Sequence, residues 1–339
     1  MAAKRFPILF IAPSRIGDAV LSSGLIRALA DEVGGARFTV VASALTAPLF
    51  AEVPGLDRVI IMEKRPLGGH WIALWNEVRD RRWGLVVDLR GSGLAGLLRP
   101  VRRAVHRPGG PPVHKVIEAA RLLRLEQTPP APFLFTTTET EARAAALTAG
   151  EAPILAIAPA ANWVGKTWPA ERFSLVARAI LGPDGPLPGG RLMVLGGPDD
   201  RETLLALRGA FPRSRLIDLV GAESLLVAYA ALRHVRLFIG CDSGLMHMAA
   251  AAGAPTLGLF GPSDERLYAP WGANTRTVRG SRTFEEIRAR DPHLNQAICH
   301  MMELRVDAVV AAARALIADT EPDCSARALD PPGGHAAGF

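Results

Sequence analysis

The stretch from Leu237 to Gly261 carries in succession the signals of a strand, a polar turn, a helix and a second strand. Residues 237–239 form a short apolar run of the kind found in buried strands, and Gly240 interrupts that run. Residues 246–252 are rich in helix-forming residues, and the glycine and proline that follow end the predicted helix. The apolar residues 257–260 then return to the strand pattern. This order predicts parallel strands joined by a crossover helix.

The same alternation runs along the rest of the chain without tight hairpin signals. Near-continuous apolar strands separated by helices are typical of parallel sheets that are covered on both faces. We therefore expect an α/β protein with two doubly wound units. The predicted strands are residues 6–12, 38–42, 59–62, 85–89, 154–158, 191–195, 216–219, 237–239 and 257–260, and the main predicted helices are residues 19–29, 46–52, 71–81, 114–125, 224–232 and 303–317.

The length of 339 residues and the 49% hydrophobic composition allow a sizeable core and favour two domains over one. The proline-rich residues 127–132 look like the approach to a domain junction. We expect an N-terminal domain over residues 1–150 and a C-terminal domain over residues 151–318. Residues 319–339 are expected to form a loose tail.

Three cysteines, Cys241, Cys299 and Cys324, are widely spaced and form no C-x-x-C pair. This spacing indicates neither a disulfide framework nor a zinc site, and we expect no bound metal. The first apolar run is short, lacks a cleavage pattern and soon meets Arg15 and Asp18, so it predicts a strand instead of a signal peptide. No window has the roughly 18 apolar residues of a membrane span. A soluble protein of the cytoplasm is the expectation.

The positive charge is concentrated in the N-terminal half. Between Arg58 and Arg124 there are 14 lysine and arginine residues against 5 aspartate and glutamate residues, a net charge of +9. Such a field attracts nucleic acid, anionic lipid headgroups or a polyanionic substrate. No basic motif interleaved with aromatic residues is present, so nucleic acid is not expected as a partner. An arginine-rich solvated face is the alternative.

Polar residues gather at the start of the helix predicted over residues 246–252. Asp242 and Ser243 lie where the first backbone N–H groups, those of Gly244 to Met246, lack partners and the helix dipole is positive. An anion such as a diphosphate is favoured there, and His247 lies on the same helix face. The alternative is that Asp242 and Ser243 cap a core helix and His247 is a packed histidine.

Two further polar turns have a similar construction. Residues 158–168 follow a predicted strand and carry Asn162 and Lys166. Residues 13–18 follow the first strand and end in Asp18. Because ligands of doubly wound sheets bind at the carboxyl ends of the strands, a cleft between the two domains is the expected active site.

Gly91, Gly93 and Gly96 form a G-x-G-x-x-G pattern after a predicted strand. This pattern leaves open an NAD-dependent oxidoreductase. The acidic residue that would hold the ribose about 20 residues further on is missing, and arginines stand in that region instead. A glycine-rich loop that a sugar acceptor approaches is the preferred interpretation.

Several motifs together resemble glycosyltransferase family 9, the heptosyltransferases of the lipopolysaccharide core. They are SRIGDAVLSSGLIRAL at residues 14–29, GKTWPAERF at 165–173, LVGAESL at 219–225, DSGLMHMAAAAGAPTLGLFGPS at 242–263 and CHMMELRVDAVV at 299–310. The resemblance implies a GT-B fold, with two Rossmann-like domains facing across a cleft. It also implies an N-terminal acceptor domain, a C-terminal nucleotide-sugar domain, and inverting transfer without a catalytic metal.

The resemblance further implies roles for individual residues. Asp18 corresponds to the general base on the acceptor hydroxyl, and Lys166 to the lysine on the donor diphosphate. Asp242, Ser243 and His247 correspond to the turn that holds the sugar and phosphates, with Asn162, Gly244 and Met246 nearby, and Glu202 to a nucleoside contact. For Asp18 a capping role, for Lys166 a solvated surface position and for Glu202 an exposed helix start are the alternatives. We expect the acceptor to meet basic and polar residues of the N-terminal domain, namely Ser14, Arg15, Arg90, Arg99, Arg102 and Arg103.

The family suggests ADP-heptose as donor, no further cofactor, and an anionic lipid-linked saccharide as acceptor at the cytoplasmic face of the inner membrane. One departure concerns the turn at residues 158–162, where relatives carry H-P-G and small hydroxyl residues and this chain reads Ala-Pro-Ala-Ala-Asn. Besides the oxidoreductase, a sugar-nucleotide-binding protein without catalysis is an alternative.

Overall fold

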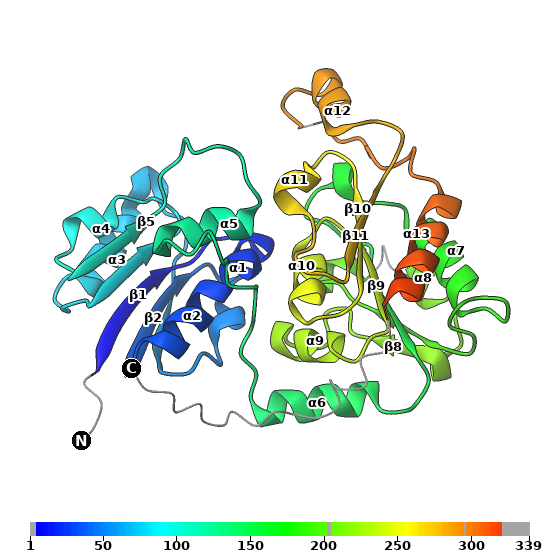
Figure 1. Cartoon of the computed structure of the whole chain (residues 1–339), viewed down its shortest axis with the longest axis horizontal. Coiled ribbons are helices and arrows are strands. Elements are labelled where there is room, and N and C mark those ends of the chain that lie inside the picture. The colour runs from blue at the N-terminus through cyan, green and yellow to red at the C-terminus, as the bar shows by residue number, and fades with distance from the viewer. Residues whose placement is uncertain (1–4, 202–204, 295, 321–339) are drawn as a thin grey trace.

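The computed structural model describes residues 5–201, 205–294 and 296–320. The predicted nucleoside contact Glu202, and the predicted tail from residue 321 on, lie outside these residues. Two α/β domains lie side by side, with the N-terminal domain in blue and cyan and the C-terminal domain in green to red (Figure 1). Each domain is built on a parallel sheet, as the strand and helix alternation predicted.

The N-terminal sheet has five parallel strands in the order β3-β2-β1-β4-β5. The central strand β1 is buried because both of its edges are paired and both faces are covered. Ile8 and Phe10 belong to the core on one face, whereas Leu9 and Ile11 belong to the core on the other. Successive residues of a strand point to opposite faces, which explains why this strand is continuously apolar. The strands are β1 Phe6–Ile11, β2 Ala36–Ala42, β3 Leu56–Ile61, β4 Leu85–Asp88 and β5 Arg102–Val105.

The C-terminal sheet has six parallel strands in the order β11-β10-β9-β6-β7-β8. Helices α7 and α13 pack on one face, together with Leu155 and Ile157 of β6, and helices α9 and α10 pack on the other, together with Ala156 and Ala158. The strands are β6 Ile154–Ala158, β7 Arg191–Val194, β8 Leu216–Asp218, β9 Leu237–Cys241, β10 Thr256–Phe260 and β11 Thr275–Arg279.

The helices connect these strands. They are α1 Ile16–Ser22, α2 Gly24–Glu32, α3 Gly69–Val78, α4 Leu94–Leu97, α5 Lys115–Ala120, α6 Thr138–Thr148, α7 Ala170–Leu181, α8 Leu205–Arg208, α9 Leu225–Leu232, α10 Gly244–Ala251, α11 Glu265–Tyr268, α12 Phe284–Arg290 and α13 Val306–Asp319, with short 3-10 turns η1 Ala47–Phe50, η2 Pro66–Gly68, η3 Arg121–Leu123, η4 Val164–Lys166, η5 Pro198–Asp200 and η6 Arg213–Arg215. None of the described helices is long and apolar enough to cross a lipid bilayer.

Two of the differences between the structure and the predicted elements concern the first helix and two edge strands. The helix predicted over residues 19–29 is broken at Ser23, whose hydroxyl donates to Val20 O and accepts from Phe133 N. The carbonyl of Pro130 crosses so close that a Cβ on Gly24 would lie 2.4 Å from it. Strands β5 and β11 were not predicted, because edge strands are half exposed and need no long apolar run.

The connection between the domains leads from α5 to α6. Helix α6 lies before residue 150 in the chain, yet it packs against α9 of the C-terminal domain (Figure 1). The carboxyl ends of the parallel strands of both sheets carry the polar turns that the sequence singled out.

Candidate active site between the two domains

The amino-terminal ends of α1 and α10 meet where the two domains touch. A Cβ on Gly244 would lie 2.5 Å from Cγ2 of Ile16, and a Cβ on Gly17 would lie 3.1 Å from Cδ2 of His247. Only glycine allows backbones to approach this closely. The contact brings Asp18, in the first turn of α1, next to the polar turn that opens α10.

Asp242 is the centre of the polar cluster on the C-terminal side. Its Oδ2 accepts from Lys166 Nζ at 2.6 Å and from Ser263 Oγ at 2.5 Å, and its Oδ1 lies 3.7 Å from His247 Nε2. Burial raises the pKa of Asp242, but the His247 ring and the Lys166 ammonium outweigh burial and hold this pKa well below its usual range. Asp242 therefore stays ionised and fixes the position of Lys166.

The helix that follows this cluster lacks a capping side chain. Ser243 is the N-cap residue of α10 and its side chain makes no capping hydrogen bond. Two buried atoms of this turn, Ser243 Oγ and His247 Nδ1, have no hydrogen-bond partner among the described residues. A helix start without a capping side chain and a nearby lysine are features of an anion site. The Met246 side chain is fully buried in the core, so only its backbone N–H could serve a ligand.

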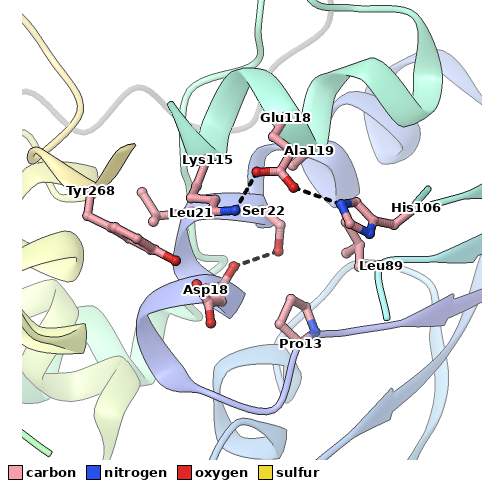
Figure 2. Close-up of a pocket in the computed structure, with 10 residues that line it drawn as sticks. All are labelled: Pro13, Asp18, Leu21, Ser22, Leu89, His106, Lys115, Glu118, Ala119 and Tyr268. Atoms are coloured by element: carbon pink, nitrogen blue, oxygen red, sulfur yellow. Dashed lines mark hydrogen bonds and ion pairs between the residues drawn. The ribbon is translucent and has the colours of Figure 1, made fainter. Parts of the chain in front are cut away.

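Asp18 lies in a pocket of about 210 Å³ between the domains (Figure 2). Burial raises the pKa of the Asp18 carboxyl, and the positive charges of Arg15 and Lys115 oppose that effect only in part. A carboxylate with a raised pKa is a better proton acceptor than an ordinary aspartate. The pocket is lined by Pro13, Asp18, Leu21, Ser22, Leu89, His106, Lys115, Glu118, Ala119 and Tyr268.

A charged array that the sequence analysis missed forms one wall of this pocket. Glu118 accepts from Lys115 Nζ at 2.5 Å through one oxygen and lies 2.7 Å from His106 Nε2 through the other (Figure 2). Burial raises the pKa of Glu118, but these two partners lower this pKa by more than burial raises it. The Glu118 carboxylate therefore stays ionised. Lys115 and Glu118 are three residues apart on a helix, a spacing that the sequence does reveal. His106 follows β5, and only the tertiary structure brings it to Glu118.

The C-terminal domain closes the pocket from the opposite side. Tyr268 lies with its ring centre 5.8 Å from Lys115 Nζ. Next to it, His114 Nε2 lies 2.9 Å from Ala269 O, and the His114 ring is 4.8 Å from that of Trp271. The start of α5 is thus held against the segment that follows α11, and the pocket has walls from both domains.

The other residues predicted to meet the acceptor differ in their placement. Ser14 and Arg15 are exposed beside the start of α1. Arg90 turns inward, where its Nε donates to Ala12 O at 2.7 Å, and burial lowers its pKa. Among the predicted donor residues, Asn162 is exposed in the turn before η4.

The structure does not bring Arg99, Arg102 and Arg103 to the pocket. Arg102 and Arg103 are the first residues of β5 and pair with the first residues of β4. They therefore lie at the amino edge of the parallel sheet, whereas Asp18 lies beyond its carboxyl edge. All three are exposed. The expectation that these arginines line the cleft is corrected, because strand direction places them at the other end.

The glycine pattern at residues 91–96 is not built as a dinucleotide site. Asp88 accepts hydrogen bonds from the N–H groups of Arg90 and Ser92, so the protein's own carboxylate occupies the donors of this turn. The helix that follows, α4, has only four residues, so few aligned peptide dipoles face a phosphate. Gly91 and Gly93 have positive φ, which accounts for glycine at these two positions.

Comparison with known proteins identifies the family of this chain. The sequence profile of glycosyltransferase family 9 (heptosyltransferase) matches residues 74–295. Lipopolysaccharide heptosyltransferase 2 of Salmonella typhimurium is 24% identical, and the match covers 84% of this chain and 91% of the relative.

Two solved structures share the fold. The family 9 glycosyl transferase of Veillonella parvula has a TM-score of 0.73 at 19% identity, with 94% of this chain and 99% of the other covered. The ADP-heptose lps heptosyltransferase II of E. coli has a TM-score of 0.70 at 21% identity, covering 93% and 99%. The predicted GT-B fold is confirmed. This chain belongs to glycosyltransferase family 9, the heptosyltransferase family, and is a glycosyltransferase.

Proposed function

We propose that this protein transfers heptose from ADP-heptose, with inversion, to an anionic lipid-linked saccharide of the lipopolysaccharide core. The observation that carries the proposal is the contact between α1 and α10, because it puts a carboxylate of one domain beside an anion site of the other. The names of the relatives supply the sugar and the nucleotide: one is a lipopolysaccharide heptosyltransferase and another an ADP-heptose lps heptosyltransferase.

In this mechanism Asp18 is the general base. It accepts the proton of the acceptor hydroxyl while that oxygen forms a bond to the anomeric carbon and the bond to the ADP oxygen breaks. Inversion requires the base and the leaving group to lie on opposite faces of the sugar. Asp18 on α1 would supply the base on one face. Lys166 and the N–H groups of α10, from the other domain, would hold the leaving diphosphate on the opposite face.

The leaving diphosphate gains negative charge as its bond to the sugar breaks. Lys166, held by Asp242, and the N–H groups of Gly244 to Met246 would stabilise that charge electrostatically. Ser243 Oγ and His247 Nδ1, which are buried without partners among the described residues, are further hydrogen-bonding groups for the donor. This proposal assigns no role to a metal ion.

We place the reaction at the cytoplasmic face of the inner membrane, with the enzyme in peripheral contact with it. The support is the net charge of +9 between Arg58 and Arg124, which would be attracted to anionic lipid and to a phosphorylated acceptor.

The test is a transfer assay with ADP-heptose and two acceptors, heptose-free and monoheptosyl lipopolysaccharide. ADP release and a mass gain of one heptose on either acceptor are expected. A parallel thermal-shift screen with ADP-, GDP-, UDP- and dTDP-sugars identifies the nucleotide. Stabilisation by a nucleotide sugar without transfer to any core acceptor would support the alternative, a binding protein without catalysis.

A further inference from the structure

A second pocket adjoins the one that holds Asp18. It has a volume of about 360 Å³ and shares His106, Lys115 and Glu118 with the first pocket. This size lies within the range of small-molecule sites, roughly 300–1,000 Å³. Its remaining lining comes from β5 and the loop after it, from η3, and from Leu267 of the C-terminal domain. The two pockets are therefore neighbouring compartments separated by the array around Glu118.

The charges of this second pocket are unbalanced. Its lining contains one carboxylate, Glu118, and both oxygens of that carboxylate already have partners in Lys115 and His106. Arg107 and Arg121 also line the pocket, and within the described part of the chain neither forms an ion pair. Two guanidinium groups thus line the pocket without an acidic partner among the residues that the structure describes.

The loop beside Arg121 fits this guanidinium. Arg121 Nη1 donates to Pro111 O at 3.3 Å, which fixes the direction of the side chain. A Cβ on Gly110 would lie 3.1 Å from the same nitrogen, so glycine leaves the room that the guanidinium needs. Gly109 has a φ of 105°, which the loop can adopt because this residue is glycine.

We infer that this second pocket binds an anionic substituent of the acceptor, a phosphate monoester or a sugar carboxylate, through Arg107 and Arg121. The inference rests on the proposed function and adds to it the group by which the acceptor is recognised. Guanidinium groups bind both anions through paired N–H donors. An acceptor spanning both compartments would present its hydroxyl to Asp18 while its charged group lies beyond the Glu118 wall.

The experiment compares Arg107→Met and Arg121→Met with Arg102→Met, a matched control that removes an exposed arginine outside both pockets. Acceptor binding is measured without donor, on heptose-free and monoheptosyl lipopolysaccharide, and acceptor KM is measured where transfer occurs. Losing a hydrogen-bonded charge typically weakens binding by about 10- to 100-fold. We expect that loss, and a weaker salt dependence, for the two pocket variants and neither effect for Arg102→Met.

Arg121→Lys keeps the charge and should recover part of the affinity, which separates a binding role from a folding defect. The anion is identified with two modified acceptors, one dephosphorylated with hydrofluoric acid and one with its carboxyl groups reduced. The modified acceptor that lacks the recognised anion should bind wild-type and Arg121→Met protein equally weakly. Equal effects of all three methionine variants, or none, would overturn the inference. Absence of transfer with arginine-dependent binding would instead contradict the proposed function alone.

Discussion

Gly17 of the N-terminal domain faces His247 of the C-terminal domain so closely that a Cβ on Gly17 would lie 3.1 Å from the ring atom Cδ2. The neighbouring contact is tighter still, because a Cβ on Gly244 would lie 2.5 Å from Ile16 Cγ2. These distances make the position of Asp18 relative to the turn at Asp242 and Ser243 depend on two residues without side chains.

Gly244→Ala should therefore push α1 away from α10 and lower kcat at least about tenfold, since small displacements of reacting groups can cost up to a hundredfold. Gly34→Ala is the control, because a Cβ there meets nothing within 4 Å. The measurement is kcat for both variants, together with their melting temperatures. Normal turnover by Gly244→Ala would show that the close approach of the helices is not needed for catalysis.

Asp18→Asn removes the proposed proton acceptor but keeps the size of the side chain. The hydrogen bond from Ser22 Oγ goes to the backbone oxygen of Asp18, so the substitution leaves it in place. Loss of a general base typically costs 10²- to 10⁴-fold in rate. We expect kcat to fall by at least about a hundredfold, with donor affinity and melting temperature near those of the parent. Turnover close to normal in the folded variant would remove Asp18 from the mechanism.

With Asp18 as the proposed general base, the pH dependence of kcat/KM is expected to report its ionisation in the free enzyme. Because burial raises the pKa of Asp18, activity should be lost as the pH falls through a value above the ordinary aspartate pKa of about 3.9. Lys115 is one of the positive charges that oppose this rise, alongside Arg15.

Lys115→Met should therefore move the acidic limb of the profile to higher pH, whereas Lys115→Arg should leave it near the wild-type position. Both variants are compared with wild type across the same buffers at constant ionic strength, since salt screens the interaction. An acidic limb that stays at the same pH in Lys115→Met would mean that this lysine does not influence the base.

Asp242→Asn should weaken both stability and donor binding. Asp242 is 6% exposed and its substitution leaves the Lys166 ammonium without its carboxylate partner, which typically costs about 1–3 kcal/mol. Since the folded pKa of Asp242 is lowered, its contribution is present above the unfolded pKa of about 3.9 and is lost as the pH falls further.

Urea unfolding at neutral pH should therefore separate Asp242→Asn from wild type, and the difference should shrink below about pH 4. Asp31→Asn is the comparison, because its ion pair with Arg27 is exposed and worth at most about 1 kcal/mol. A variant as stable as wild type at neutral pH would show that the Lys166 pair contributes nothing to folding.

The sequence by itself determined the class of fold and the family. Apolar runs such as Ile8–Ile11 and Leu237–Ile239 predict strands that are buried on both faces. Each such strand can be predicted from its own segment of sequence alone. The turns that carry Asp18, Lys166 and Asp242 could be identified because each follows such a strand, and parallel strands end at the same edge of a sheet.

Only the tertiary structure decided which residues share the site. His106 reaches Glu118 because β5, an edge strand with little apolar signal, ends beside α5. The same strand carries Arg102 to the opposite edge, although Arg102 and His106 are four positions apart in the sequence. Local patterns report how each segment is buried, whereas strand order, strand direction and the docking of the domains determine which distant side chains meet.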